Sequence, residues 1–178
     1  MNHKILDNTS QQEVADLFKA VFTSSEGEQE GKLIGELASK LSSGIDDQEI
    51  ICIGAYEDDS IIGSIFFTRL GFSEAIRVYM LAPVAVNTRH QGMGVGQALI
   101  NYGLDEMRRR SVDVVVTYGD PAFYAKTGFL PLSESSIKAP LKLSMPQGWL
   151  GQSLTEAPIP TLEERPECVK AFNDPVYW

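Results

Sequence analysis

The sequence is short of cysteine, histidine and long apolar runs, and each shortage excludes a class of protein. It contains 2 cysteines and 2 histidines in 178 residues. Cys52 lies within an apolar run and Cys168 lies near the end, a pattern that predicts neither a disulfide framework nor a metal site. No stretch approaches the roughly 18 apolar residues of a membrane span, and no signal peptide is recognisable. We therefore expect no metal, no membrane association and a cytoplasmic location.

Basic residues are also scarce. There are 15 Lys and Arg against 24 Asp and Glu, and the formal net charge is -9. This balance argues against nucleic acid as a partner and mildly favours a cationic or amine substrate. A hydrophobic fraction of 43% over 178 residues fits one soluble domain, so we expect a single domain over residues 1–178. The sequence leaves both a monomer and a homodimer open.

The first half of the chain predicts two helices and then a group of strands. An apolar patch at residues 5–6 is expected to be an edge strand. Helical spacing predicts one helix from Ser10, with Ser10 and Glu13 as a capping box, to about residue 22, and a second helix over about 30–41. Gly31 and Gly35 weaken the second prediction. Residues 24–31 are polar and are expected to form the connecting link.

Strand-like runs at 49–57 and 60–70 flank Asp58-Asp59, which predicts a hairpin, and a further strand is expected at 75–86. Gly63 predicts a bulge or a close contact. The valine-rich run at 112–118 predicts another strand, and apolar pieces at 149–154 and 168–172 are expected to close the sheet. An antiparallel meander therefore precedes a strand-helix-strand crossover, whose two strands should be parallel neighbours.

The most informative stretch is Gln-Gly-Met-Gly-Val-Gly at residues 91–96, between the strand at 75–86 and a helix at 97–110. Glycines at alternate positions let the backbone approach a bulky anion and expose N–H groups that no helical carbonyl uses. A pyrophosphate is the natural occupant of such a turn. A P-loop would need Lys and Ser or Thr after the glycines, and the dinucleotide fingerprint needs G-x-G-x-x-G directly after a strand, so neither fits.

These residues resemble the Gcn5-related N-acetyltransferases. Residues 91–96 are similar to the Q/R-x-x-G-x-G/A signature of that family, residues 81–86 resemble its fourth strand, and residues 119–129 resemble its F-Y-x-x-x-G-F segment in the form found in the YhbS-like subgroup. The resemblance covers roughly residues 50–132. It implies an α/β (α+β) fold with a mixed central sheet of about six to seven strands and flanking helices. Its parallel fourth and fifth strands splay apart to hold acyl-CoA.

The resemblance implies acetyl-CoA as co-substrate. The pantetheine arm would lie along the main chain of the fourth strand, and the glycine stretch would wrap the pyrophosphate. The expected cofactor-binding residues are Val84, Ala85, Val86, Gln91, Gly92, Met93, Gly94, Val95, Gly96 and Phe123. Arg89 and His90 could meet the adenosine 3'-phosphate or form a solvated surface pair. The resemblance also places the link at 24–31 beside an acceptor cleft, although a solvated connector fits equally well.

Tyr124 matches the family's general acid. A phenol with a pKa of about 10 stays protonated at neutral pH and can donate to a leaving thiolate. The alternative is a tyrosine packed in the core with an ordinary hydrogen-bond partner. The strand at 75–86 carries no carboxylate, so Tyr79, Glu74 and a water relay all stay open as general base. Asp120 is expected to cap the short helix that holds Tyr124, and Arg108 to Arg110 to complement the negative end of the long helix.

The sequence therefore predicts an N-acetyltransferase that moves acetyl from acetyl-CoA to an amine by direct attack. The acceptor would be a small-molecule or peptide amine, whose identity the sequence does not give. Two alternatives stay open. One is a non-catalytic acyl-CoA binding or regulatory module. The other is a transferase of longer acyl groups or one that uses a hydroxyl acceptor.

Overall fold

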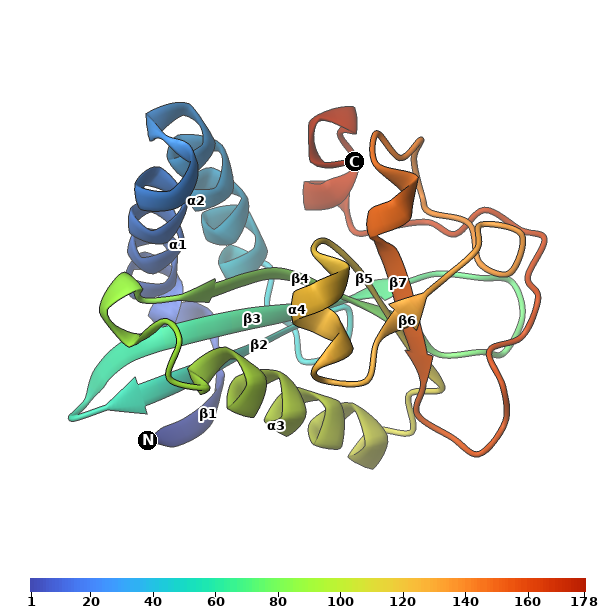
Figure 1. Cartoon of the computed structure of the whole chain (residues 1–178), viewed down its shortest axis with the longest axis horizontal. Coiled ribbons are helices and arrows are strands. Elements are labelled where there is room, and N and C mark those ends of the chain that lie inside the picture. Colours follow the sequence, from blue (N-terminus) through green and yellow to red (C-terminus); the bar gives the residue numbers. More distant parts are fainter. The chain divides into compact units, whose positions relative to one another are not determined.

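The computed structural model describes all of residues 1–178, which divide into two compact units. The first unit comprises residues 1–67 and 83–103, and the second comprises residues 68–82 and 104–178. Both contain helices and strands (Figure 1). The expectation that the chain forms one domain stays a prediction.

The strands form a single mixed sheet. It contains β1 (Asn2–Leu6), β2 (Ile50–Glu57), β3 (Ser60–Leu70), β4 (Val78–Val86), β5 (Val114–Tyr118), β6 (Leu130–Pro131) and β7 (Trp149–Ser153), in the order β1-β2-β3-β4-β5-β7-β6. β4 and β5 are parallel, whereas β1 pairs antiparallel with β2, and β7 pairs antiparallel with both β5 and β6. The predicted α/β class, with six to seven strands and a parallel fourth and fifth strand, is confirmed.

Two antiparallel helices, α1 (Gln11–Glu26) and α2 (Glu28–Ser43), lie side by side in the first unit (Figure 1). Glycines let them approach closely, because a Cβ atom at Gly31 would lie 1.8 Å from the hydroxyl oxygen of Thr23. A Cβ atom at Gly35 would lie 2.9 Å from the Cβ of Lys19. Glycine has a low intrinsic helix propensity. At Gly31 and Gly35, however, its small size lets the two helices pack closely.

The predicted link at 24–31 is wrong. Both helices extend into it, and the turn between them is Gly27, whose φ of 98° suits glycine. The predicted capping box is wrong as well, because the side chain of Ser10 makes no capping hydrogen bond. The Glu13 carboxylate instead accepts a hydrogen bond of 2.5 Å from the hydroxyl of Tyr56. Glu13 thus connects α1 to β2, and burial together with this contact raises the pKa of Tyr56.

Within the first unit β3 is covered on both faces. Phe66 packs against Phe18 of α1 with ring centroids 5.8 Å apart. On the opposite face lies α3 (Val95–Arg109), where a Cβ atom at Gly103 would lie 2.5 Å from the Phe67 ring. Successive side chains of a strand point to opposite faces, so this arrangement accounts for a continuous apolar run rather than an alternating one.

Two local predictions on β3 are confirmed. Asp58 and Asp59 form the β2–β3 turn with φ of 48° and 61°, as a tight hairpin turn requires. Gly63 is a point of close contact, since a Cβ atom there would lie 3.2 Å from the Leu99 side chain of α3. The bulk of a larger side chain would separate the helix from the strand.

In the second unit, β4 begins at Val78 rather than at residue 75, because the Arg77 amide donates to the carboxylate of Asp113 instead of to a strand carbonyl. The predicted strand at 149–154 is present as β7. The predicted strand at 168–172 is wrong: the region contains only the 3-10 turn η4 (Lys170–Phe172), preceded by an isolated bridge between Gly71 and Glu167. The prolines that surround this region cannot donate to a ladder.

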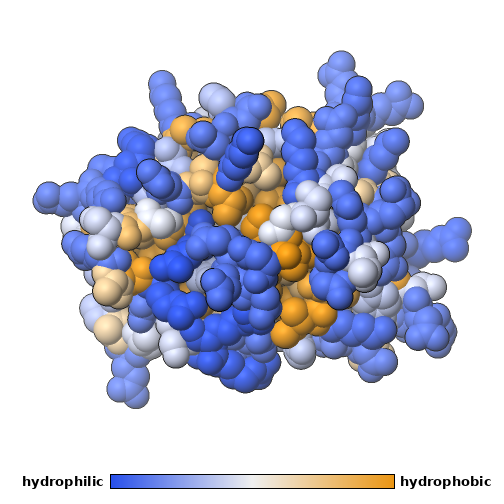
Figure 2. Space-filling view, turned by 180° about the vertical axis from the view of Figure 1, so that it is seen from behind, coloured by the Kyte–Doolittle hydropathy of each residue, from blue (hydrophilic) through white to orange (hydrophobic).

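The surface carries many hydrophilic residues, as Figure 2 shows for one face, with apolar residues visible between them. None of the helices combines the length and the apolar character needed to cross a bilayer.

Candidate functional site

A first candidate region is the connection from β4 to α3. β4 ends at Val86, and a 3-10 turn, η2 (Thr88–His90), follows. Asn87 fixes this exit in two ways. Its backbone amide donates to the Ile62 carbonyl over 2.8 Å, and its side-chain oxygen accepts from the Arg89 amide over 3.0 Å. These two hydrogen bonds therefore fix the direction in which the chain leaves β4.

The glycine stretch that follows is open to solvent. Gly92 and Gly94 have φ of 76° and 81°, and a Cβ atom at either would meet no atom within 4 Å. Residues 91–94 are exposed, and Met93 is 70% exposed. The Ala98 amide makes a helical bond to the Gly94 carbonyl over 3.0 Å, so the amides before it lie at the positive end of α3. This is the geometry that an anion such as pyrophosphate needs.

The side chains around this loop support its shape. Gln91 turns back and donates from Nε2 to the Val86 carbonyl over 3.0 Å, which connects the loop to the end of β4. Ala85 is buried, whereas Val84 and Val86 are half-buried. The sequence assigns these residues to the cofactor and gives no sign that the Gln91 side chain holds the loop itself.

His90 has a protein partner, Glu57 at the end of β2, with 2.9 Å between Nε2 and the carboxylate. The sequence left open a phosphate contact or a solvated surface pair for His90, and it did not predict this contact with Glu57. Arg89 is exposed. A contact of either residue with a phosphate stays a prediction.

A second candidate region lies in the second unit, on the short helix α4 (Pro121–Ala125). Asp120 caps it by accepting a hydrogen bond of 3.0 Å from the Ala122 amide, which confirms the predicted capping role. The cap presents Tyr124 inward. Its ring meets Phe123 and Phe129 edge to face, with centroids 5.0 and 5.7 Å apart, and a Cβ atom at Gly119 would lie 2.8 Å from it.

Tyr124 is 9% exposed, and this burial raises the pKa of its phenol to about 12. A hydrogen bond with the Thr117 side chain acts in the opposite direction, and the charge of Asp120 adds a smaller increase. The phenol is therefore protonated throughout the physiological range. A protonated phenol can donate to a leaving thiolate, as the predicted general acid must.

Thr117 is the polar residue near this tyrosine that sequence reasoning missed. It is fully buried in β5, and its hydroxyl donates to the Leu81 carbonyl of β4 over 2.7 Å. Leu81 and Thr117 are also the last register pair between the two strands, although both strands continue beyond it. No local pattern reveals this contact, because the two residues are 36 positions apart.

The structure does not single out one residue as the general base. Tyr79 is 1% exposed in β4, and Glu74 is exposed and lies outside that strand. The three candidates from the sequence therefore stay open. No group of three or more His, Cys, Asp or Glu side chains is arranged to hold a metal ion. The expectation that the reaction uses no metal stays a prediction.

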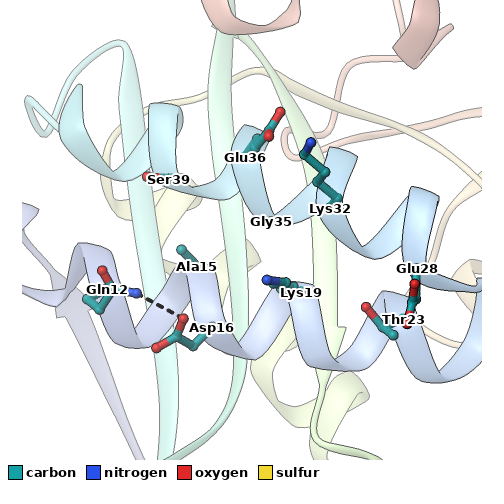
Figure 3. A pocket seen from close by; sticks show the side chains of 10 residues that line it. All are labelled: Gln12, Ala15, Asp16, Lys19, Thr23, Glu28, Lys32, Gly35, Glu36 and Ser39. Atoms are coloured by element: carbon teal, nitrogen blue, oxygen red, sulfur yellow. Dashed lines mark hydrogen bonds between the residues drawn. The ribbon is translucent and has the colours of Figure 1, made fainter.

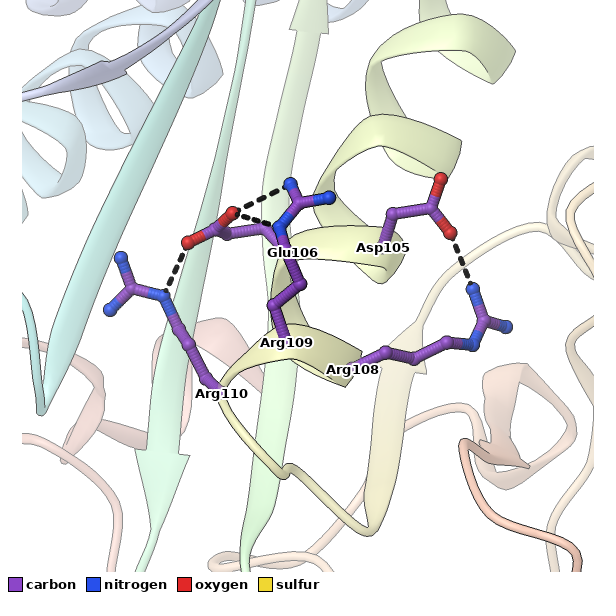
Figure 4. Close-up of polar contacts among 5 residues, drawn as sticks. All are labelled: Asp105, Glu106, Arg108, Arg109 and Arg110. Atoms are coloured by element: carbon purple, nitrogen blue, oxygen red, sulfur yellow. Dashed lines mark hydrogen bonds and ion pairs between the residues drawn. The ribbon is translucent and has the colours of Figure 1, made fainter.

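Arg108 and Arg109 at the end of α3, and Arg110 just beyond it, contact acidic residues of that helix (Figure 4). Arg108 contacts Asp105 over 2.8 Å, while Arg109 and Arg110 contact Glu106 over 2.7 and 2.9 Å. Both arginines lower the pKa of Glu106 against the opposing effect of its burial. These contacts fit the predicted role at the negative end of the helix.

A separate groove of about 580 Å³ runs between α1 and α2 (Figure 3). Its lining includes the small residues Ala15 and Gly35. It also includes the charged side chains of Asp16, Lys19 and Glu36. Charges of both signs line it, and Asp16 accepts a hydrogen bond of 2.9 Å from Gln12. The groove is not among the regions that the sequence singled out.

The sheet, the glycine loop and the aromatic helix α4 define an acetyltransferase fold, and comparison with known families agrees. Residues 12–129 match the acetyltransferase (GNAT) family, and this match covers more than half of the chain. The chain therefore belongs to the GNAT family, which confirms the resemblance to the Gcn5-related N-acetyltransferases.

Two bacterial proteins are similar in sequence to this chain. The chain is 33% identical over 113 residues to the uncharacterized N-acetyltransferase YjhQ of Escherichia coli K12, a match that covers 60% of this chain and 62% of YjhQ. It is 29% identical over 109 residues to the uncharacterized N-acetyltransferase YhbS of the same strain, covering 60% and 61%. The chain thus matches about three fifths of the length of each relative.

Solved structures show the fold. E. coli YhbS in complex with CoA superposes with a TM-score of 0.70 at 22% identity and covers 86% of this chain and 81% of its own. A GNAT acetyltransferase from Brucella melitensis in complex with acetyl-CoA gives a TM-score of 0.67 at 20% identity and covers 97% of both chains. At these identities the likeness establishes the arrangement of the elements.

Proposed function

We propose that the protein is an acyl-CoA-dependent N-acetyltransferase that transfers acetyl from acetyl-CoA to a small-molecule or peptide amine. The observation that carries the proposal is the open loop at residues 91–94, whose two positive-φ glycines leave the backbone accessible to an anion. Family membership and two structural neighbours solved with CoA and acetyl-CoA support the same cofactor.

In the proposed complex the loop amides hold the pyrophosphate, and the pantetheine arm lies along Val84, Ala85 and Val86. Most of the contacts to the pyrophosphate and the pantetheine arm would come from the main chain, which agrees with the small side chains in the loop. Met93, Val95 and Gly96 contribute through their backbone, Gln91 by holding the loop, and Phe123 by packing beside Tyr124. These assignments follow the family pattern and the local geometry of each segment.

The proposed chemistry is direct attack. The nitrogen lone pair of the amine forms a bond to the thioester carbon, the carbon–sulfur bond breaks, and its electron pair moves to sulfur. Tyr124 then gives its proton to the sulfur, which leaves as the CoA thiol. The amine must also lose one proton, which a water relay can deliver to solvent, and the Tyr124 phenolate regains a proton from solvent. Cys52 is buried, and burial raises the pKa of its thiol to about 12, so it is not a reactive thiolate.

The experiment is a free-thiol release assay with acetyl-CoA over a panel of amines, run beside calorimetry with acetyl-CoA alone. We expect binding of acetyl-CoA together with thiol release that depends on the amine. Replacing acetyl by longer acyl groups, and the amines by alcohols, tests the alternative transferases in the same assay. Tight binding with no release on any acceptor would favour a non-catalytic acyl-CoA module, which the absence of a carboxylate in β4 would then explain.

A further inference from the structure

The groove between α1 and α2 carries its charges in a fixed order. Lys19 of α1 and Lys32 of α2 lie on the side nearer to the turn at Gly27 (Figure 3). Asp16 and Glu36 lie about one helical turn farther from it. Along the hairpin of the two helices, a basic pair is therefore followed by an acidic pair. These four side chains define the charged face of the hairpin.

Packing between the helices holds the two members of each pair at similar heights. A Cβ atom at Gly35 would lie 2.9 Å from the Cβ of Lys19, so these two positions are level with each other. On this register the acidic residues, Asp16 and Glu36, differ in height by about 3 Å along the hairpin. Lys19 and Lys32 differ by about 5 Å. Each pair therefore forms one patch of charge that spans both helices.

The charges of this face are not neutralised within the chain. Lys19, Lys32 and Glu36 are exposed, and none of them forms an ion pair or a side-chain hydrogen bond. Asp16 is exposed too, and its side chain accepts a hydrogen bond from the neutral Gln12. Asp16 and Lys19 are three positions apart on one helix, a spacing that allows an ion pair, but they form none. Both signs of charge are therefore available to a partner.

A second copy of this face is complementary to the first in one orientation. Two copies can meet about a two-fold axis in the plane between them, either parallel or perpendicular to the helices. A parallel axis keeps the order of the pairs and brings lysines onto lysines. A perpendicular axis reverses the order, so that Lys19 faces Asp16 of the second copy and Lys32 faces its Glu36. The remaining offset of about 4 Å along the helices is within the reach of a lysine side chain.

We propose that the charged face of α1 and α2 is the contact surface of a homodimer built about this perpendicular axis. The proposal does not depend on the reaction. Two 16-residue helices are about 24 Å long and present a face roughly 20 Å wide, so the contact buries about 1,000 Å² in total. This area is at the low end of specific interfaces, and exposed ion pairs are weak. The dimer is therefore reversible, and salt weakens it.

The first test is sedimentation equilibrium of the whole chain. We expect a monomer–dimer equilibrium whose dissociation constant rises at least about tenfold between about 0.05 and 0.5 M NaCl. Lys19→Glu should raise it at least about tenfold as well, because a two-fold axis repeats each change on both sides of the contact. Lys40→Glu is the matched control, since it makes the same change of charge at an exposed position of α2 outside the groove. It should leave the dissociation constant close to that of the wild type.

Mixing two variants tests whether opposite charges on this face bring the copies together. Lys19→Glu with Lys32→Glu makes both pairs acidic, and Asp16→Lys with Glu36→Lys makes both pairs basic. All four positions are exposed, so both variants should keep the helical circular dichroism of the wild type. Each variant alone should be monomeric, and an equimolar mixture should form a heterodimer. A dimer in either variant alone, or no heterodimer in the mixture, would overturn the proposal.

A fourfold exchange tests the orientation at constant net charge. It combines Asp16→Lys with Lys19→Asp on α1, and Lys32→Glu with Glu36→Lys on α2. About the perpendicular axis every contact keeps opposite charges, so this variant should dimerise with a dissociation constant close to that of the wild type. It should not pair with the wild type, because like charges would then meet. A monomeric exchange variant, or a wild-type chain that stays monomeric at about 0.5 mM in low salt, would overturn the proposal.

Discussion

At the scale of single residues, Tyr124 is the side chain on which the proposed chemistry depends. Replacing it with Phe keeps the ring and its edge-to-face contacts with Phe123 and Phe129 but removes the proton donor. We expect turnover to fall by about 10² to 10⁴-fold while the affinity for CoA stays nearly unchanged. Steady-state kinetics and calorimetry measure the two quantities. Unchanged turnover would exclude Tyr124 from the mechanism.

The same residue predicts how stability depends on alkaline pH. Burial raises the pKa of the Tyr124 phenol from 10.0 to about 12, so the folded state favours the protonated form. The corresponding contribution to the free energy of unfolding, roughly 2–3 kcal/mol, is fully present below about pH 10 and is lost as the pH rises through about 12. Urea unfolding should show a smaller loss over this interval for Tyr124→Phe than for the wild type. Equal losses would contradict the burial argument.

Residue-level prediction from the sequence succeeded where the relevant contacts are local. The Asp120 cap and the Asp58-Asp59 turn lie within short segments, and both are present. It failed where tertiary contacts compete. Glu13 pairs with Tyr56, 43 residues away, instead of closing a capping box, and Thr117 reaches a carbonyl 36 residues away. Such contacts have no signature in a single sequence.

At the scale of elements, the glycine loop can be tested apart from general backbone strain. Gly94 has a φ of 81° and open space around it, so alanine there adds strain to the loop proposed to hold the anion. We expect Gly94→Ala to weaken CoA binding at least about tenfold, a change of about 1.4 kcal/mol.

Gly27 is the matched control for Gly94. It has a φ of 98° and equally open space, but it lies in the turn between α1 and α2. Gly27→Ala should cost a similar amount of stability, about 1–2 kcal/mol, and leave the Kd for CoA unchanged. Calorimetric titration with urea unfolding measures both quantities. Equal loss of CoA affinity in the two variants would show that strain alone is responsible.

Element boundaries show why prediction is best in the middle of the chain. The order β4, loop, α3 and β5 follows from periodicity and glycine spacing, which act over short distances. The extension of α1 and α2 over the predicted link depends instead on packing, because Gly31 and Gly35 let the two helices touch. The G-x-x-x-G spacing of these glycines is a signal that could have indicated close helix packing.

At the scale of the whole molecule, the sequence predicted the class of fold because two motifs in order, on a strand-helix-strand crossover, restrict the topology strongly. The closing segments were predicted less well. Residues after Phe129 contain proline-rich connections, and they form one five-residue strand, one two-residue strand and several 3-10 turns. A two-residue strand such as β6 exists only because β7 is there to pair with it.

The central claim is that backbone amides in residues 91–96 bind the diphosphate of coenzyme A. The most direct measurement is a calorimetric comparison of CoA with pantetheine, which has the same thiol arm but no diphosphate. We predict measurable binding of CoA and much weaker binding of pantetheine, with the difference reduced in Gly94→Ala. No heat with CoA at millimolar excess, or equal affinity for both compounds, would contradict the account.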